Sequence, residues 1–367
     1  MRGWLVPALC IATVILSASC AAAGGERRAT ATSINGPGAL ATDNRGHLFV
    51  IEIIKNKVLR IDLQGGKIST VAGNGKKCCY KEGAKATEVS LNSLLSLAVD
   101  AHGNLFIGEG NQIRVVDGST GFISTVAGDA MPGNTVNGIS ARSAHFWGIS
   151  GLAVDSDGNL FAADQYQARI FKIDVKNGTV RIYAGSDKSG YEGDGGLAVD
   201  AAFRFPSGLA TDKGGNLIVA DFENCAIRRV DRETGIVKTV AVTGGVEQNC
   251  IERPDNSRPG AFPSHPASDV AGNIYFAEGS MDFVMRIDAS TFAVSVVAGN
   301  GHRGFSGDNS AATQAQLDNP SGLAIDLDGN VFIAEYGNNR VRRVDAKTKV
   351  ITTVAGNGIA HRTDIYM

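Results

Sequence analysis

Residues 317–358 read LDNPSGLAIDLDGNVFIAEYGNNRVRRVDAKTKVITTVAGNG. Four short apolar runs (GLAID, NVFIAE, RVRRVD and VITTVAG) are separated by residues that favour turns, and none has the length or periodicity of a helix. The first turn, DLDGN at 326–330, has a glycine where a tight hairpin needs a positive φ, and an aspartate that can accept bonds from the turn amides. The stretch therefore predicts one four-stranded antiparallel sheet.

The turn glycine of this stretch recurs along the chain. It is found at Gly46, Gly103, Gly158, Gly215, Gly272 and Gly329, at intervals of 57, 55, 57, 57 and 57 residues, which indicates a repeat architecture. Six such units predict an all-β fold, a six-bladed β-propeller of four-stranded antiparallel blades. Near-continuous apolar runs such as GLAVD and NLFIA support it, because neighbouring blades cover both faces of each sheet.

A single propeller is expected to occupy residues 34–367, after a signal peptide at 1–23 and a junction at 24–33. The β-prone segment 28–34 is predicted to pair with the outer strand of the last blade and so close the ring. The expected blades lie near 34–75, 91–128, 146–185, 203–245, 262–301 and 317–358.

The repeated pattern VAGNG…P-x-G-L-A-x-D-x-x-G-N-[LV]-[FI]-[IV]-A-[DE]…R-[IV]-R-x-V-D resembles the NHL repeat. It is most similar to the variant with a long GNG…GDG loop, seen in extracytoplasmic sensor regions of bacterial receptor kinases and in teneurins. The resemblance covers residues 34–358 and implies a propeller fold. It leaves function open, because the family includes binding platforms, scaffolds and a few lyases.

The amino terminus predicts export. An apolar run at 5–16 is followed by small residues, with cleavage expected after Ser19 or near Ala23. The motif LSASC resembles a lipoprotein signal, but Leu16 lies one position too far from Cys20, so a simple secretory signal is favoured. The expected location is secreted or periplasmic, with a lipoprotein as the alternative.

The charge pattern argues against nucleic acid as a partner. The net charge is −2, cations and anions are interspersed, and there is no basic stripe. Membrane association is expected only through a lipid anchor at Cys20, and a monomer is expected.

Two carboxylates are candidate ligand-binding residues. In three blades the acid that ends the second strand has a cation five residues later, which predicts an ion pair across the hairpin. These pairs are Glu52 with Lys57, Asp164 with Arg169, and Glu335 with Arg340. Asp221 and Glu278 lack such a cation and are hypothesised to be available to a ligand or metal ion. The alternative is that they pair with Arg228, Arg286 or a loop amide.

The long connections between blades predict the binding surface, because in a propeller they emerge on one face around the channel mouth. We call this the long-loop face. The connections are 76–90, 129–144, 186–202, 246–261 and 302–316. One position of the segment that enters each inner strand, here called the lead-in residue, is Asn35, Asn92, Trp147, Arg204, Ala261 or Asp318. The residue after it is Gly36, Ser93, Gly148, Phe205, Phe262 or Asn319.

These positions differ from blade to blade within a constant frame. They are hypothesised to form a specific pocket, with Asn35, Asn92, Trp147, Arg204 and Asp318 as ligand-binding residues. The alternative is that the aromatic side chains Trp147, Phe205 and Phe262 fill gaps between blades.

The fifth blade departs from the pattern at PSHPASD, 263–269. Its second proline removes a donor from the strand ladder and predicts an irregular inner strand. Either this blade has drifted or it is modified to admit something into the channel.

Four cysteines of the exported chain suggest disulfide chemistry. Cys225 and Cys250 are both expected on the long-loop face and are predicted to form a disulfide. Cys78 and Cys79 are adjacent, so a strained vicinal disulfide and two free thiols both stay open.

No cofactor is expected, and two metal hypotheses are weighed against that expectation. The loops YEGDGG at 191–196 and FSGDN at 305–309 could supply oxygens to calcium, but turns fastened by aspartate are favoured. His145, His302 and His361 could bind zinc on the long-loop face, as in propeller lyases, but no ligand spacing supports it.

The sequence therefore predicts an exported binding or interaction module that takes a protein, glycan or small-molecule ligand on its long-loop face. The alternative is an enzyme, a metal-assisted lyase or lactone hydrolase with its site at the channel mouth. No G-x-S-x-G, H-E-x-x-H or P-loop motif is present.

Overall fold

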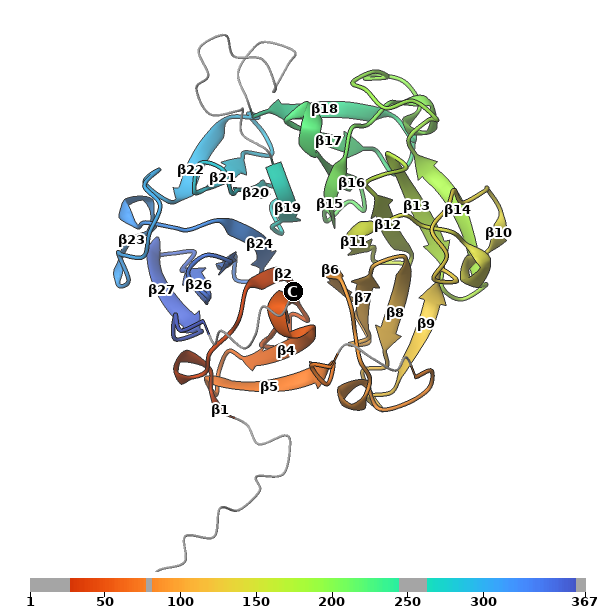
Figure 1. Ribbon diagram of the computed structural model, residues 1–367. Coiled ribbons are helices and arrows are strands. Elements are labelled where there is room, and N and C mark those ends of the chain that lie inside the picture. Colours follow the sequence, from red (N-terminus) through yellow and green to blue (C-terminus); the bar gives the residue numbers. More distant parts are fainter. Residues whose placement is uncertain (1–26, 77–80, 244–262, 361–367) are drawn as a thin grey trace, which may run out of the picture.

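Six antiparallel sheets are arranged around a central axis, and in each of them four strands follow one another in chain order from the centre to the rim (Figure 1). In three of the sheets a two-residue strand that precedes these four in the chain is added beyond the outermost one. The computed structural model describes residues 27–76, 81–243 and 263–360. The predicted six-bladed β-propeller is confirmed. Within these residues no helix has the length and apolar character needed to cross a membrane.

The blades follow one another along the chain. Blade 1 contains β1 (Arg27–Arg28), η1 (Ala29–Ala31), β2 (Pro37–Thr42), β3 (His47–Glu52), η2 (Ile53–Lys55), β4 (Lys57–Asp62) and β5 (Lys67–Ala72). Blade 2 contains η3 (Ala86–Glu88), β6 (Leu94–Val99), β7 (Leu105–Glu109), β8 (Gln112–Val116) and β9 (Ile123–Ala127). Blade 3 contains β10 (Ile139–Ser140), η4 (Ala141–Ser143), β11 (Ile149–Val154), β12 (Leu160–Asp164), β13 (Arg169–Asp174) and β14 (Thr179–Ala184).

The second half repeats this order. Blade 4 contains η5 (Ala198–Asp200), β15 (Pro206–Thr211), β16 (Leu217–Asp221), η6 (Phe222–Asn224), β17 (Ala226–Val230) and β18 (Val237–Val242). Blade 5 contains β19 (Pro263–Ser268), β20 (Ile274–Glu278), β21 (Phe283–Ile287) and β22 (Val294–Ala298). Blade 6 contains β23 (Ser310–Ala311), η7 (Ala312–Gln314), β24 (Pro320–Ile325), β25 (Val331–Glu335), β26 (Arg340–Val344) and β27 (Val350–Ala355).

The turn chemistry is as the sequence predicts. All six repeat glycines have positive φ, between 78° at Gly215 and 93° at Gly46. The aspartate before each turn accepts bonds from turn amides, as Asp326 Oδ1 does from the Asn330 amide at 2.8 Å. Asp117 lies at a different turn, the one between β8 and β9. Hydrogen bonds from Ser119 and Thr120 to its carboxylate lower its pKa to about 2.

The apolar core lies between the blades. One cluster combines Ala98 and Phe106 of blade 2 with Phe171 of blade 3, so each sheet is buried on both faces. Small residues let the inner strands approach: a Cβ on Gly322 would lie 2.3 Å from the Gly38 carbonyl oxygen. The close approach of blades 6 and 1 therefore depends on glycine at position 322.

The ring closes differently from the prediction. Segment 28–34 does not pair with the last blade; instead Arg27 and Arg28 pair with Ile68 and Lys67 of β5 in blade 1. Blade 6 reaches this segment through the Gly356 amide, which donates to the Ala29 carbonyl at 3.0 Å. The physical reason is a contact that the repeat also makes elsewhere: the Ala86 amide of η3 donates to the Gly121 carbonyl before the outer strand of blade 2, and the Ala29 amide of η1 donates in the same way to the Gly66 carbonyl of blade 1 at 2.8 Å.

The predicted irregularity of blade 5 is present. The pairing of β19 with β20 shifts register between Ser264 and Ala267. Within this shift His265 adopts a φ of 42°, at the register where β15 has Gly208. The backbone therefore turns His265 out of the regular ladder.

Candidate functional site

The acids that end the second strands hold the lead-in residues in place. In five blades this acid accepts the backbone N–H of the residue 17 positions earlier: Glu52 from Asn35, Glu109 from Asn92, Asp164 from Trp147, Asp221 from Arg204, and Glu335 from Asp318. The donor–acceptor distances run from 2.7 Å at Trp147 and Arg204 to 3.3 Å at Asp318. The carboxylates thus build the frame of the channel mouth.

The predicted ion pairs across the hairpins are wrong. Within the described residues, no ion pair joins Glu52 to Lys57, Asp164 to Arg169 or Glu335 to Arg340. Arg169 donates to the Ser186 carbonyl instead, and Arg340 to that of Asn357. The reason is geometric, because the carboxylates turn inward to the lead-in amides, and Arg169 and Arg340 turn outward to loop carbonyls.

Three buried arginines fasten the long loops, and the sequence-based predictions named only one of them, Arg228, as an alternative partner of Asp221. Arg114, Arg228 and Arg342 lie on β8, β17 and β26, with side chains at most 1% exposed. Each lies between the acid that ends the second strand and an acid of the preceding loop. Their spacing of 114 residues (228 − 114 and 342 − 228), twice the repeat, was the available signal. We call each such arginine with its two acids an arginine clamp.

Blade 6 shows the clamp clearly. Arg342 lies 2.8 Å from Asp308 Oδ1 and 3.4 Å from Glu335 Oε1, and it donates to the Gln316 and Ser306 carbonyls at 3.0 and 2.9 Å. The guanidinium thereby satisfies most of its donors on the loop. The loop acid Asp308 thus fixes its loop to blade 6 through side-chain bonds. The sequence had suggested that this loop could either supply oxygens to calcium or form a turn fastened by aspartate.

The candidate acid Asp221 belongs to the second clamp. Its Oδ2 lies 3.5 Å from Arg228 Nη1, which is the alternative that the sequence left open. Arg228 also lies 2.8 Å from Asp194 Oδ1. Glu278 is buried and accepts bonds from the Ser280 hydroxyl and the Met281 amide, both at 2.8 Å. Both acids are engaged within the protein.

Burial changes the acidity of these carboxyl groups. It raises the pKa of Glu335 to about 7 and that of Asp221 to about 6, against the opposing effect of their arginine partners. Burial also raises the pKa of Glu109 and of Asp164. These four acids at the ends of second strands are therefore harder to ionise than ordinary surface carboxylates.

Aromatic side chains gather at the mouth in blades 3 and 4. Trp147 is 49% and Tyr166 63% exposed. Tyr166 makes an edge contact with Phe205 at 5.5 Å between ring centroids, and Phe205 lies 6.2 Å from Phe222. Trp147 Nε1 donates to Asn134 of the neighbouring loop at 3.1 Å. We call these four aromatic residues the aromatic rim.

The other predicted site residues are distributed one per blade. Asn35 is buried against Glu52 and lines a cavity of about 460 Å³ in blade 1, while Asn92 is exposed. Arg204 pairs with Glu223 at 2.9 Å, and Asp318 lies 3.4 Å from Arg303. The structure therefore distributes them around the mouth, and Ala261 and Phe262 lie outside the described residues.

One histidine belongs to the channel. The ring of His265 makes a hydrogen bond with the backbone of Leu95 in blade 2, and its Nδ1 is buried without a partner among the described residues. Burial lowers the pKa of His265 to about 4, so the ring is neutral at pH 7. The irregular β19 thus places a polar ring in the channel.

The remaining predictions concern cysteines and metals. Cys225 is fully buried after η6, but Cys250, Cys78 and Cys79 lie outside the described residues, so the disulfide stays a prediction. Of the histidines proposed for zinc, His145 lies 3.1 Å from Asp129 and His361 is not described. Within the described ranges no group of three His, Cys, Asp or Glu side chains could hold a metal ion.

Comparison with known proteins agrees with the fold. The NHL repeat profile matches residues 203–229. The chain is 27% identical to the chloroplastic protein SUPPRESSOR OF QUENCHING 1 of Arabidopsis thaliana, over 87% of this chain and 31% of that protein. It is 27% identical to teneurin-3 of Danio rerio (76% and 10%) and 26% identical to NHL repeat-containing protein 2 of Bos taurus (86% and 47%). The chain thus spans less than half the length of these relatives.

Solved structures share the architecture at low sequence identity. A streptogramin B lyase has a TM-score of 0.52 and 16% identity, over 93% of this chain and 88% of that one. An auxiliary nutrient binding protein of Bacteroides thetaiotaomicron has a TM-score of 0.60 and 14% identity, over 88% and 70%. These matches define the class as a propeller of consecutive blades. The repeat match and the named relatives support an NHL-repeat propeller family for this chain.

Proposed function

We propose that this protein is an exported binding module that engages a protein or glycan with its long-loop face. The observation that carries the proposal is the aromatic rim. Aromatic side chains supply large contact areas at low entropic cost, and they are usually buried when they serve only packing.

The backbone of the rim supports a binding role. Phe205 has a φ of 55°, a conformation unfavourable for a bulky residue. Ser93 and Asn319 share it at the equivalent register, and both are smaller and polar. Strain of this kind is tolerated where a side chain serves a site. The clamps on Arg114, Arg228 and Arg342 further hold the neighbouring loops in fixed positions.

Paired selections test this proposal. A random peptide library and a glycan array are probed with the wild-type protein and with the double variant Trp147→Ser/Tyr166→Ser. The matched control is Leu327→Ser, a residue 60% exposed in a first turn on the opposite face. Ligands that bind wild type and the control at least tenfold better than the double variant support the proposal. Ligands that bind all three proteins equally contradict it.

Export is part of the proposal and is tested separately. The predicted signal peptide at 1–23 supports a secreted or periplasmic location, and intact mass of the expressed protein identifies the new amino terminus. A mass increase that corresponds to a lipid on Cys20 would show that the signal peptide is a lipoprotein signal and not a simple secretory one. Peptide mapping without reduction tests the proposed Cys225–Cys250 disulfide, which fails if Cys225 reacts with an alkylating reagent.

A second candidate is an enzyme at the channel, and His265 is the observation that favours it. A neutral imidazole with a buried, unpartnered Nδ1 could accept a proton from a substrate in the channel. Because a streptogramin B lyase shares the fold, a streptogramin B antibiotic is the probe. A product formed by wild type and not by His265→Ala supports this candidate, and an unchanged chromatogram contradicts lyase activity on this substrate.

A further inference from the structure

In four blades, an oxygen from the preceding loop binds the outer strand at one register. Glu82 accepts the Thr125 amide at 2.8 Å, Asp194 accepts the Thr239 amide at 2.8 Å, and Asp308 accepts the Thr353 hydroxyl at 2.6 Å. In blade 3 Asn137 accepts the Ile182 amide at 3.0 Å. Every such acceptor lies four residues before the first residue of a 3₁₀ turn: Ala86, Ala198, Ala312 or Ala141.

Blade 1 has the same strand position, but its sequence has no acceptor side chain at the corresponding loop position. Thr70 pairs with Leu59 as Thr125 pairs with Arg114, so it occupies the equivalent register. The corresponding 3₁₀ turn begins at Ala29, and four residues earlier the chain has Gly25, which has no side chain. Leu59 also replaces the clamp arginine. Blade 1 therefore has the binding position of the repeat, while its sequence has glycine at the position of the loop acid and leucine at that of the clamp arginine.

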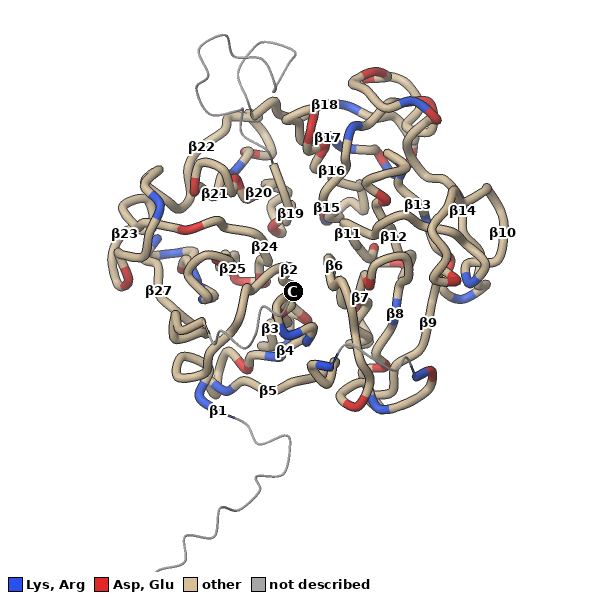
Figure 2. The backbone as a smooth tube through the Cα atoms, viewed as in Figure 1, with Lys and Arg blue, Asp and Glu red and all other residues tan. Residues whose placement is uncertain are grey.

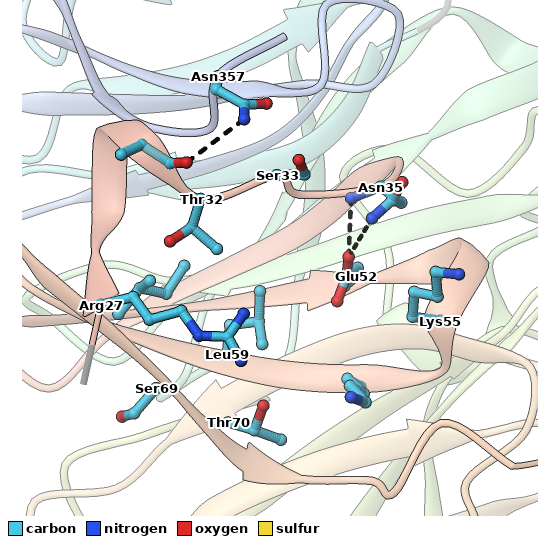
Figure 3. A pocket seen from close by; sticks show the side chains of 13 residues that line it. Arg27, Thr32, Ser33, Asn35, Glu52, Lys55, Leu59, Ser69, Thr70 and Asn357 are labelled. Carbon is cyan, nitrogen blue, oxygen red and sulfur yellow. Dashed lines mark hydrogen bonds between the residues drawn. The ribbon is translucent and has the colours of Figure 1, made fainter. Parts of the chain in front are cut away.

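A cavity of about 460 Å³ lies at this position (Figure 3). Ser69 and Thr70 lie on one side, and the Arg27 side chain extends over Leu59. Thr32 and Ser33 of the amino-terminal segment line it from above. We call it the blade-1 pocket.

The charge of the pocket favours an anion. Arg27, Lys55 and Lys57 line it against a single acid, Glu52, whose Oε1 already accepts two bonds from Asn35 at 2.9 and 2.6 Å. Within the described residues the side chains of Arg27 and Lys57 make no hydrogen bond or ion pair. A carboxylate bound between Arg27, Lys57 and Thr70 would make the contacts that the loop acid makes in each blade with an arginine clamp.

We propose that the blade-1 pocket binds an aspartate or glutamate side chain carried on a loop of a partner protein. The carboxylate takes the place that Glu82, Asp194 and Asp308 occupy in blades 2, 4 and 6. It accepts a hydrogen bond from Thr70. Arg27 supplies a guanidinium in place of the clamp arginine, whose strand position is occupied by Leu59 in blade 1. This site is separate from the aromatic rim, so the two proposals fail independently.

The probe is the chain's own blade-6 loop as a capped peptide, RGFSGDNSAA, which is residues 303–312. It is titrated into the ¹⁵N-labelled exported chain and followed through the amide signals of Ser69 and Thr70. The expected result is saturable binding that is about tenfold weaker for the peptide RGFSGNNSAA, because that change removes only the charge. Equal binding of the two peptides, or no binding, overturns the proposal.

Protein variants locate the site. Arg27→Gln and Thr70→Val are expected to weaken peptide binding severalfold, whereas Lys238→Gln, an equal charge change on the exposed edge of β18, is expected to leave it unchanged. Equal loss in all three variants would indicate general charge attraction and overturn the proposal. Sodium acetate that moves the same signals as strongly as the peptide, or binding seen only in Glu26→Gln, would also overturn it. The acetate result would assign the pocket to small carboxylates. Binding seen only in Glu26→Gln would assign it to the chain's own amino terminus.

Discussion

At the residue scale, the arginine clamps explain how long loops stay ordered around an open mouth. A guanidinium at zero exposure is costly unless its donors are satisfied, and Arg342 finds two carboxylates and two carbonyls. The neighbouring Arg343 has a different role, since its side chain is 37% exposed and pairs with Asp345. Two adjacent arginines on β26 therefore differ sharply in what they contribute.

Replacing Arg342 by methionine tests this difference. Removing one partner of a buried pair leaves Glu335 uncompensated, so the free energy of unfolding is expected to fall by about 3–5 kcal/mol. The matched variant Arg343→Met is expected to cost less than about 1 kcal/mol, as for a surface pair. Urea unfolding measures both, and equal effects would contradict the structural role of the clamp.

The raised pKa of Glu335 predicts a pH dependence. Between the ordinary value of 4.5 and about 7, the folded state binds more protons at this group than the unfolded state. Stability from this group is therefore present at low pH and lost as pH rises through that window. In Glu335→Gln the loss is expected to be absent.

The measurement is the unfolding free energy of both proteins from pH 4.5 to pH 7.5. Wild type is expected to lose a few kcal/mol relative to the variant across this range, because each unit of pKa shift corresponds to about 1.4 kcal/mol. Parallel profiles would mean that Arg342 keeps the carboxylate ionised throughout. Turn aspartates such as Asp117, with pKa near 2, act only at lower pH.

At the element scale, the inner strands are set by close backbone approach. A Cβ on Gly322 would lie 2.3 Å from the Gly38 oxygen and 3.0 Å from Ala39 Cα, at the seam between blades 6 and 1. Gly322→Ala is therefore expected to destabilise the fold by about 1–3 kcal/mol through overpacking. The control is Gly190→Ala, whose Cβ would have its nearest contact at 3.7 Å. Thermal unfolding that shows equal shifts would contradict this account.

Local elements were predictable from the sequence, and pairings between elements were not. Gly329 and Asp326 fix their turn by backbone conformation and short-range bonds, which residue type alone specifies. The partner of Glu335 depends on how far the loop before β24 folds back, and five-residue spacing to Arg340 gave the wrong answer. The blade-1 pocket was not predicted, because it depends on two differences from other blades. Gly25 stands at the position of the loop acceptor, and Leu59 stands at the position of the clamp arginine.

At the scale of the whole molecule, charges are distributed evenly and the ring closes without a shared strand. Figure 2 shows acidic and basic residues interspersed over all the blades. Each sheet is made of strands consecutive in the chain, with β1 added to its own blade. Between blades 6 and 1 the Gly356 amide bonds Ala29, and the Ser321 hydroxyl bonds the Pro37 carbonyl at 2.9 Å. The closing seam is built like the other seams.

Circular permutation tests this closure. Residue 360 is joined to residue 27 by a flexible linker of about eight residues. A permutant opened between blades, at 187/188, is expected to unfold close to the wild-type midpoint. One opened inside blade 4, at 233/234, makes both chain ends share a sheet and is expected to unfold more slowly, because opening the ring then requires breaking a strand ladder. Faster unfolding of the second permutant would contradict this view of the seam.

The alternation of clamped and unclamped blades gives the molecule a hidden symmetry. Arg114, Arg228 and Arg342 mark every second blade, while Leu59, Phe171 and Met285 occupy the same strand position in the others. The natural building unit is therefore a pair of blades. A fragment of that size holds every kind of interface the ring uses, so three copies turned by about 120° could assemble as a cyclic trimer with the shape of the single chain.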